Sequence, residues 1–378
     1  MQIPFNKPYL TGNELEYIRA AHANGQLAGE GPFTRKCQEW LENKTKASKA
    51  LLTHSCTAAL EMSAILLNFQ PGDEVILPSY TFVSTANAFA LRGGVPVFVD
   101  IRADTLNMDE DQIERAITLK TKAIVPVHYA GVGCAMDKIS AIAAGRRIPI
   151  IEDAAQAVGS SYQGRALGSF GSLAALSFHE TKNIISGEGG ALLVNDPEFK
   201  GRSEVIWEKG TNRKQFFRGQ VDKYSWVDLG SSYLPGEIMA AFLWSQMENA
   251  EAITEKRLHI WGRYHAGFEG LEKSGKIRRP IIPADCGHNA HMYYLLLPDL
   301  KTRTGLMKFL KESGILSVFH YVPLDSSPMG KKLGRPSGDL KVTRDLSDRL
   351  LRLPLWIGMD KEVDYVIDKV RVFVDQQV

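Results

Sequence analysis

Cysteine is scarce in this chain of 378 residues, and no two cysteines are spaced as a pair. None belongs to a Cys-x-x-Cys motif, which argues against a zinc ribbon and against a disulfide framework. We therefore expect four free thiols. They are Cys37, Cys56, Cys134 and Cys286.

Long apolar runs and an excess of one charge are also missing. No stretch approaches the roughly 20 apolar residues that a membrane-spanning helix needs, and the N-terminus lacks a charged segment followed by an apolar run. The 45 basic and 43 acidic residues are mixed along the chain and leave a net charge of +2, so no surface for nucleic acid is expected. These absences predict a cytoplasmic protein whose partners are small molecules.

The glycine fingerprint of dinucleotide-binding proteins is absent too. A nicotinamide-dependent oxidoreductase needs Gly-x-Gly-x-x-Gly after an early strand. The nearest glycine groups, at residues 29–31 and 131–133, lack the third glycine. This class of enzyme is therefore disfavoured.

Short apolar runs alternate with helical patterns from residue 50 onward. Apolar residues recur every three or four positions over 57–67, 84–91, 109–117 and 136–144, which indicates helices. The alternation predicts an α/β fold with a mostly parallel, seven-stranded sheet flanked by helices, in which ligands bind beyond the carboxyl ends of the strands. The predicted strands are 50–53, 75–77, 97–99, 123–127, 148–151, 173–178 and 191–194.

The remaining segments suggest two domains. An N-terminal arm with two helices precedes the sheet, and residues 205–232 are predicted to form a long irregular loop, a feature that is more often functional than idle. A helix over roughly 237–264, broken once, bridges a large domain (1–245) and a smaller α+β domain (246–378). The link from strand 173–178 to strand 191–194 is too short for a parallel crossover, so the last strand is predicted to be antiparallel.

Two charged residues follow predicted strand ends. Lys182 lies just beyond strand 173–178, although most loop lysines are simply solvated. Asp153 follows strand 148–151, where a carboxylate can bind Mg²⁺, act as a general base, pair with a protonated ring nitrogen, or cap a helix. Metal binding is the weakest of these alternatives, because no further oxygen ligands lie nearby at a suitable spacing.

Two more segments add to this pattern. Ser55 to Thr57 open a helix after the first strand, where free N–H groups can bind an anion or the hydroxyls can act as ordinary caps. Phe82 follows the second strand and can stack on a ring or fill the core. Together, the helix start, the aromatic ring, the carboxylate and the lysine 29 residues after it match pyridoxal phosphate, with Lys182 as the Schiff-base residue.

Motifs along nearly the whole chain carry a family resemblance. The sequence resembles the sugar-nucleotide aminotransferases of the DegT/StrS family, within the fold-type I pyridoxal phosphate enzymes. The motifs are Ser-Cys-Thr-Ala-Ala-Leu at 55–60, Gly-Asp-Glu-Val-Ile at 72–76, Glu-Asp-Ala-Ala-Gln at 152–156, Ser-Phe at 177–178 with Lys182, Gly-Glu-Gly-Gly at 187–190, His-Tyr-Val-Pro-Leu at 320–324 and Arg-Leu-Leu-Arg-Leu-Pro-Leu at 349–355.

The resemblance implies a role for each matching residue. Lys182 would be the catalytic residue, and pyridoxamine phosphate would be the intermediate form of the cofactor. Asp153 would pair with the pyridine nitrogen, Gln156 would donate to the ring hydroxyl, and Phe82 would stack on the ring. The residues implied for the phosphate are the amides of Cys56 and Thr57 and the hydroxyl of Ser177.

The resemblance further implies a homodimer with shared active sites. The partner subunit would contribute from the segment near Ser232. Many members have Gly-x-Asn-x-Arg there, and this chain has Gly-Ser-Ser-Tyr-Leu at 230–234, so weaker or rearranged phosphate contacts are expected. Candidate substrate residues are Arg213 for the diphosphate, and His320 with Tyr321 near the sugar.

The implied reaction is transfer of an amino group from L-glutamate to the 4-keto carbon of dTDP-4-keto-6-deoxyglucose, giving dTDP-4-amino-4,6-dideoxygalactose, as in enterobacterial common antigen synthesis. Residues 209–213 to 231–233 carry this closer resemblance. The alternatives are another nucleotide-linked keto sugar (3-keto or UDP-linked), a sugar dehydratase, and a regulator without turnover. The resemblance implies that the dehydratases have histidine at the position of Lys182, which disfavours the second.

Overall fold

The computed structural model describes residues 2–376 of the chain. All seven predicted strands are present, and one continuous sheet forms from two four-stranded halves ordered β1-β9-β8-β5 and β12-β3-β2-β4. Isolated bridges from Ile124 to Ile150 and from Val127 to Asp153 join the halves. The strands are β1 (Lys49–Thr53), β2 (Glu74–Pro78), β3 (Val95–Val99), β4 (Thr121–Ile124), β5 (Ile151–Asp153), β8 (Leu173–Ser177), β9 (Gly190–Val194) and the short β12 (Arg335–Pro336).

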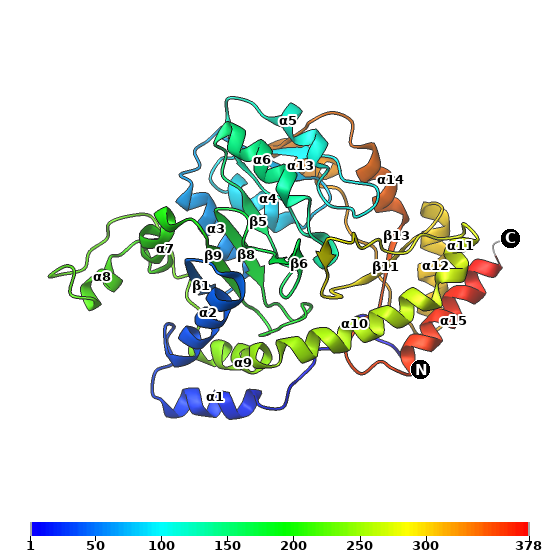
Figure 1. Cartoon of the computed structure of the whole chain (residues 1–378), viewed down its shortest axis with the longest axis horizontal. Helices are drawn as coiled ribbons and strands as arrows, with labels where there is room; N and C mark the ends of the chain where they lie inside the picture. The colour runs from blue at the N-terminus through cyan, green and yellow to red at the C-terminus, as the bar shows by residue number, and fades with distance from the viewer. Residues whose placement is uncertain (1, 377–378) are drawn as a thin grey trace.

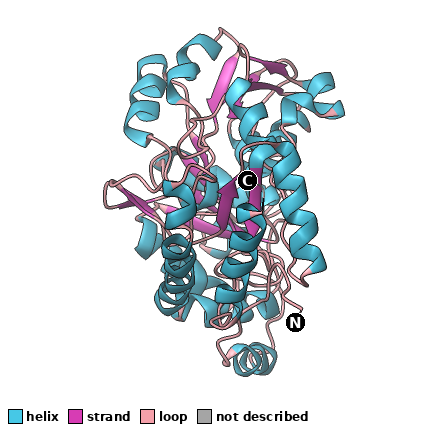
Figure 2. Ribbon diagram, turned by 90° about the vertical axis from the view of Figure 1, so that its right-hand side faces the viewer, coloured by secondary structure: helices cyan, strands magenta, loops and turns pink. Residues whose placement is uncertain are grey.

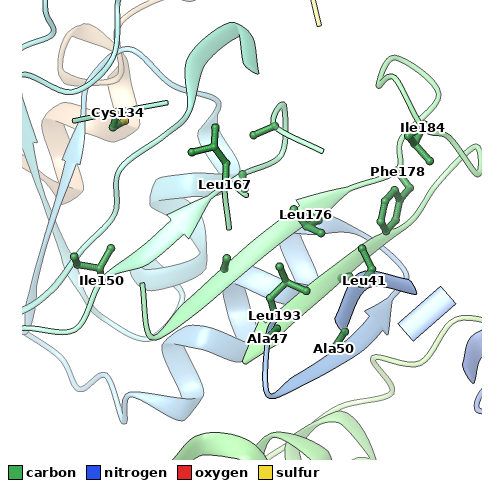
Figure 3. Close-up of a cluster of buried hydrophobic side chains, with 14 of the residues drawn as sticks. Leu41, Ala47, Ala50, Cys134, Ile150, Leu167, Leu176, Phe178, Ile184 and Leu193 are labelled. Carbon is green, nitrogen blue, oxygen red and sulfur yellow. The ribbon is translucent and has the colours of Figure 1, made fainter. Parts of the chain in front are cut away.

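Alternation along the strands gives this sheet two buried faces. In β9, Ala191 and Leu193 belong to one hydrophobic cluster, and Leu192 and Val194 belong to another. The helices on the first face are α2 (Pro32–Thr45), α6 (Met136–Arg146) and α9 (Glu237–Glu248), and those on the second are α3 (Cys56–Leu66), α4 (Val83–Ala90) and α7 (Lys200–Trp207). Figure 1 shows the layers, and Figure 3 shows the first cluster around Leu176 and Leu193.

The predicted antiparallel strand is confirmed. β9 pairs antiparallel with both β8 and β1, while the other neighbouring strands of the sheet run parallel. The returning loop contains Gly187 at φ +80°, a conformation that side chains other than glycine rarely adopt. The loop therefore leaves and re-enters the sheet at the same edge.

The C-terminal part of the chain builds a second core around a two-stranded antiparallel sheet of β11 (Tyr293–Leu296) and β13 (Leu350–Leu353). Its helices include α10 (Ala250–Gly267), α11 (Glu269–Lys273), α12 (Leu300–Glu312), α14 (Lys341–Arg349) and α15 (Glu362–Asp375). α9 and α10 meet at Asn249, and α10 runs from the central sheet to α15 (Figure 1). Figure 2 shows helices around the strands of both parts.

The division at residue 245 stays a prediction, because the C-terminal segment also returns to the large sheet. After α13 (Pro328–Leu333), β12 pairs in parallel with β3. The N-terminal arm, in turn, packs against the C-terminal core. Ile3 is buried there and bridges to Ile315, and the Trp356 indole donates to the Pro4 carbonyl at 3.1 Å. Before the sheet, the chain forms α1 (Glu14–Ala23), which packs on α9.

The prediction that residues 205–232 form one irregular loop is wrong in part. α7 extends to Trp207, whose buried indole donates to the Leu52 carbonyl at 2.6 Å, and α8 spans Arg213–Phe217. Buried Lys214 on α8 pairs with Glu30 at 2.6 Å. A five-residue helix held by such tertiary contacts has too few turns to produce a hydrophobic period.

The structure also shifts two strands. β4 spans Thr121–Ile124, where 123–127 was predicted. β5 begins at Ile151, later than predicted, because Pro149 cannot donate to the ladder and Ile150 makes only an isolated bridge. Smaller elements are η1 (Glu110–Gln112), α5 (Ile113–Ala116), and a small sheet of β6 (Ser161–Tyr162), β7 (Arg165–Ala166) and β10 (Cys286–Gly287). Among residues 2–376, none of the helices combines the length and apolar character that crossing a membrane requires.

Leu193→Ala should lower the free energy of unfolding by about 2–5 kcal/mol, because it removes a fully buried side chain from the first cluster (Figure 3) and leaves a cavity. Leu119→Ala is the matched control, since Leu119 is fully exposed and should change stability by less than about 0.5 kcal/mol. Urea unfolding followed by fluorescence measures both. Equal losses in the two variants would contradict the described core.

Candidate active site

A cavity of about 570 Å³ lies at the carboxyl ends of the central strands. It brings together segments that are far apart in the sequence, including most of the predicted site residues. The predicted residues that line it are Cys56, Thr57, Phe82, Asp153, Gln156, Ser177, Lys182, His320 and Tyr321.

Asp153 is the last residue of β5 and is only 5% exposed. Its Oδ2 accepts a hydrogen bond from the Thr85 hydroxyl at 2.7 Å, and its Oδ1 accepts the Ala155 N–H at 3.2 Å. These two donors hold the carboxylate in place at the wall of the cavity. Asp153 can therefore present a negative charge to a ligand in the cavity.

The neighbouring carboxylate, that of Glu152, has a structural role. Strand alternation points Glu152 away from the cavity, and its side chain is fully buried. It accepts N–H groups from Gly168, Phe170 and Gly171 at 2.6–2.8 Å and lies 2.9 Å from the His128 Nε2. Glu152 therefore holds the backbone before β8, and its hydrogen bonds explain why two acids stand side by side in the sequence.

Lys182 lies on the loop between β8 and β9, where its backbone N–H donates to the His179 carbonyl at 2.9 Å. Within residues 2–376, its ammonium group makes no hydrogen bond or ion pair. Burial lowers the pKa of Lys182, and the Asp153 charge acts in the opposite direction. A lysine with a lowered pKa and no partner is available as a nucleophile or a base.

The start of α3 is prepared for an anion. The Ser55 hydroxyl caps the helix by accepting the Ala58 N–H at 3.1 Å, while the N–H groups of Cys56 and Thr57 have no partner in the described chain. Gly190 packs against this turn, and any Cβ there would overlap the backbone of Ser55 and Cys56. The free N–H groups and the helix dipole favour a phosphate at this position.

Polar and aromatic groups complete the surroundings. The Ser177 hydroxyl, at the end of β8, contacts only the His179 N–H at 3.5 Å among the described residues, so it can still donate. Phe82 is 57% exposed and lies with its ring 6.3 Å from that of Tyr321. Gln156 accepts the Ala130 N–H at 2.7 Å and donates to the Tyr321 hydroxyl at 3.2 Å.

The second half of the cavity comes from the C-terminal part. The His320 Nδ1 lies 3.1 Å from the Tyr129 hydroxyl, and burial lowers the pKa of His320. Two lining residues of this part were missed from the sequence: His291, whose Nδ1 lies 3.0 Å from the Asn183 Oδ1, and Arg352 on β13. Thr85 on α4, which donates to Asp153, was missed as well. In the sequence, Arg352 could have been noticed as a charged residue inside an apolar strand. The sequence around His291 contains no pattern that indicates a site residue.

The structure places Arg213 and Ser232 elsewhere. Both line a second cavity, of about 810 Å³, next to α8. Arg213 is exposed, and its guanidinium lies 5.1 Å from the Phe217 ring centroid. A single chain therefore does not bring these two residues to Lys182, and their predicted roles stay predictions.

The residues of the first cavity fit pyridoxal phosphate. An unpartnered amine, a carboxylate, an exposed aromatic ring and an anion-ready helix start face one space. They match the four functional parts of the cofactor: aldehyde, ring nitrogen, ring face and phosphate. Within residues 2–376, no group of three or more His, Cys, Asp or Glu side chains is arranged to hold a metal ion.

Comparison with known proteins identifies the family of the chain. A model of the DegT/DnrJ/EryC1/StrS aminotransferase family matches residues 8–371. The spore coat polysaccharide biosynthesis protein SpsC of Bacillus subtilis is 33% identical over 384 aligned positions, covering 98% of this chain and 97% of SpsC. An uncharacterized protein of Methanocaldococcus jannaschii is 36% identical over 354 positions, covering 92% of this chain and 91% of that protein.

Solved structures agree as well. A putative sugar aminotransferase of Streptococcus pneumoniae, in its pyridoxal phosphate form, matches with a TM-score of 0.91 at 28% identity and full coverage of both chains. Its pyridoxamine phosphate form matches with the same TM-score at 29% identity, covering 100% of this chain and 98% of that one.

The fold is that of a fold-type I pyridoxal phosphate aminotransferase. The chain belongs to the DegT/DnrJ/EryC1/StrS aminotransferase family, whose model spans nearly all of it. The fold class, the enzyme class and the cofactor predicted from the sequence are thereby confirmed.

The rate at which cofactor-free protein captures pyridoxal phosphate should rise with pH through a midpoint below 10.5, the ordinary lysine pKa, because burial favours the neutral amine of Lys182. Asp153→Asn should lower the midpoint further, since it removes a charge that favours the ammonium. Stopped-flow absorbance measures the rate, and free Nα-acetyl-lysine corrects for titration of the cofactor. A midpoint at or above 10.5 would contradict the described environment.

Proposed function

We propose that this enzyme transfers an amino group from L-glutamate to the 4-keto carbon of dTDP-4-keto-6-deoxyglucose, giving dTDP-4-amino-4,6-dideoxygalactose. The observation that carries an amino transfer is the presence of an unpartnered Lys182 and a buried Asp153 in one cavity. The sugar substrate is supported by the names of two relatives, one a spore coat polysaccharide biosynthesis protein and the other a putative sugar aminotransferase.

The closer choice of substrate rests on sequence. The segments 209–213 and 231–233 resemble the enzymes that form this product, and in the structure they lie together beside the second cavity. Other nucleotide-linked keto sugars, either 3-keto or UDP-linked, are the alternative substrates. They share the same amino transfer and differ in how the sugar lies above the cofactor.

Bound pyridoxal phosphate supplies an aldehyde that takes up the amino group and a ring that withdraws electrons from the reacting carbon. With the cofactor bound, the Lys182 Nζ would take the proton from the α-carbon of L-glutamate and would hold it within the site as the base of this half-reaction. With the sugar, the same nitrogen moves the proton in the opposite direction, onto the carbon that receives the amine. One base thus serves both half-reactions.

Asp153 and Thr85 act on the ring nitrogen. The Thr85 hydroxyl donates to the carboxylate of Asp153 at 2.7 Å. A carboxylate held there would stabilise a protonated ring nitrogen of the bound cofactor. Thr85 in turn lies 2.9 Å from the Thr81 hydroxyl, so the carboxylate is oriented by a short chain of hydroxyls.

A homodimer with shared sites is part of the proposal. Arg213 and Ser232 line one cavity on the same chain, so they serve the partner's cofactor site together or not at all. The same region exposes apolar side chains suited to a second copy of this chain. They are Phe217, Trp226, Val227 and Leu229.

Purified enzyme with L-glutamate should aminate dTDP-4-keto-6-deoxyglucose faster than 3-keto or UDP-linked sugars, as measured by mass spectrometry of the products. Lys182→Ala should lose the visible absorbance of bound cofactor and all turnover. If the enzyme prefers a different keto sugar, the proposed substrate is wrong and the proposed class of reaction still holds. Absence of any spectral change with several amino donors would favour a regulator.

Mixing inactive subunits tests the shared site. If Arg213 acts in the partner's site, a dimer of one Lys182→Ala chain and one Arg213→Gln chain has one complete site, and activity should return to about half of the wild-type value in that species. If Arg213 acts within its own chain, neither site is complete. Activity of the purified mixed dimer, set against each parent variant, measures the difference.

A further inference from the structure

A buried network of side chains ties the segment before β11 to the loop that carries Lys182. The Asn183 amide donates to the Asn289 carbonyl at 2.6 Å, and the Asn183 Oδ1 lies 3.0 Å from the His291 Nδ1. The Asn289 side chain accepts the His291 N–H at 3.0 Å and donates to the Gln156 carbonyl at 2.9 Å. The side chains of this network are at most 7% exposed. The network therefore fixes the His291 ring against the residue that follows Lys182.

These contacts decide which ring nitrogen of His291 carries the proton. A carbonyl oxygen can only accept, so the Asn289 carbonyl must receive the NH₂ group of Asn183, and the Asn183 Oδ1 is left to face the ring. An oxygen at that position requires a proton on the His291 Nδ1. The Nε2 is therefore the bare nitrogen of the neutral ring, and within residues 2–376 it has no hydrogen-bond partner.

The bare nitrogen and the Lys182 amine share the same surroundings. His291 and Lys182 line the first cavity together, and both also border a separate small space of about 10 Å³. The Lys182 amine has no partner among the described residues and ends a flexible four-carbon stem. The amine can therefore turn toward His291 without a change in the backbone.

His291 cannot compete for a proton that Lys182 carries. Burial lowers the pKa of His291 well below its usual value, and the ionisable groups that face the ring act in the same direction. These groups are Lys182, Arg352, Arg257 and His320. Arg257 also donates to the backbone carbonyl of His291 at 2.8 Å, which keeps its charge nearby. A neutral acceptor in this position can bind an N–H of the amine and leave the proton on the lysine.

We propose that His291 is a positioning residue for Lys182, whose amine donates a hydrogen bond to the bare Nε2 while it is free of the cofactor. A base that holds a proton within the site is an ammonium until it releases that proton, and an ammonium needs acceptors. One N–H held by His291 leaves the others directed at the reacting carbon. The proposal rests on the proposed function only for the role of Lys182 as the base.

Three variants of His291 separate this contact from the one with Asn183. Gln reaches the position of the Nε2 with an amide oxygen that accepts, Asn reaches only the position of the Nδ1, and Leu fills the space with neither. The measurement is the pH midpoint for capture of pyridoxal phosphate by cofactor-free protein, from stopped-flow absorbance. His291→Leu and His291→Asn should lower the midpoint by about 1–2 pH units, because the ammonium loses its acceptor, and His291→Gln should stay within about 0.5 unit of wild type.

A purely structural role of His291 predicts a different pattern. If the ring only fills space and anchors Asn183, its loss admits water, which favours the ammonium and raises the midpoint. His291→Asn would then resemble wild type, because it keeps the contact with Asn183. The other groups that act on the pKa of Lys182 are Cys56, Asp153 and Arg352, and the variants leave them unchanged.

The half-reaction with L-glutamate gives a second measurement. In a single turnover, His291→Leu and His291→Asn should slow the loss of pyridoxal phosphate absorbance about tenfold to a hundredfold, with the half-saturating L-glutamate concentration within about twofold. Deuterium at the α-carbon of L-glutamate should slow these variants more than it slows wild type, because proton transfer becomes the limiting step.

His288→Leu is the matched control. His288 precedes β11 in the same segment, lies outside both cavities, and accepts the Ala290 N–H at 3.3 Å. This variant should leave the capture midpoint and the half-reaction unchanged. Thermal unfolding of each variant checks that the fold is retained.

A midpoint that rises or stays unchanged in His291→Leu overturns the proposal, and so does a midpoint that His291→Asn restores and His291→Gln does not. If none of the His291 variants folds, nuclear magnetic resonance of nitrogen-15-labelled histidine decides. Cofactor-free wild type must then contain an imidazole with a proton on Nδ1 and a bare Nε2 whose signal moves in Lys182→Ala. Absence of that signal or of its shift overturns the proposal.

Failure of the proposed function is a separate result. The capture and resonance measurements use neither an amino donor nor a sugar, so a wrong choice of substrate leaves them intact. Turnover retained by Lys182→Ala would contradict the proposed function, whereas the capture midpoints of the His291 variants report on the contact itself.

Discussion

The antiparallel pairing of β9 between β1 and β8 is the constraint on which the site depends. Gly190 lies in register with Ser177 on one side and Thr53 on the other, so the ends of three strands meet at one point of the sheet edge. The loop that carries Lys182 must therefore leave and return at that edge. Because α3 starts there too, the nucleophile and the anion site are placed together by one set of backbone hydrogen bonds, before any ligand contributes.

Charge distribution in the cavity follows from this scaffold. The carboxylate of Asp153 has donors from the protein, whereas Lys182 and Arg352 are left without partners in the described chain. Their desolvation costs stability that bound cofactor and substrate offset, since a ligand that binds only the native state stabilises it by mass action.

Much of this was readable from the sequence, because local patterns govern strands and the residues that follow them. Seven strands, the returning last one, and the association of Lys182 with Asp153 came from apolar runs and their ends. His291 and Arg352 escaped because they reach the cavity from a second core more than a hundred residues away, a placement that depends on how the two cores pack. The helix α8 was not predicted because its five residues show no hydrophobic period. Tertiary contacts of Lys214 hold it in place.

The N-terminal arm has a consequence for how the chain is made. Ile3 bridges Ile315, and Phe5 lies against Arg352, so residues that are distant in the sequence complete the second core and one wall of the cavity. Contacts of such sequence separation form late, because their loop-closure entropy must be met first. A nascent chain on the ribosome can assemble the central sheet before Ile3 and Phe5 can contact Ile315 and Arg352. The wall of the cavity that carries Arg352 is therefore finished only after β13 has been synthesised.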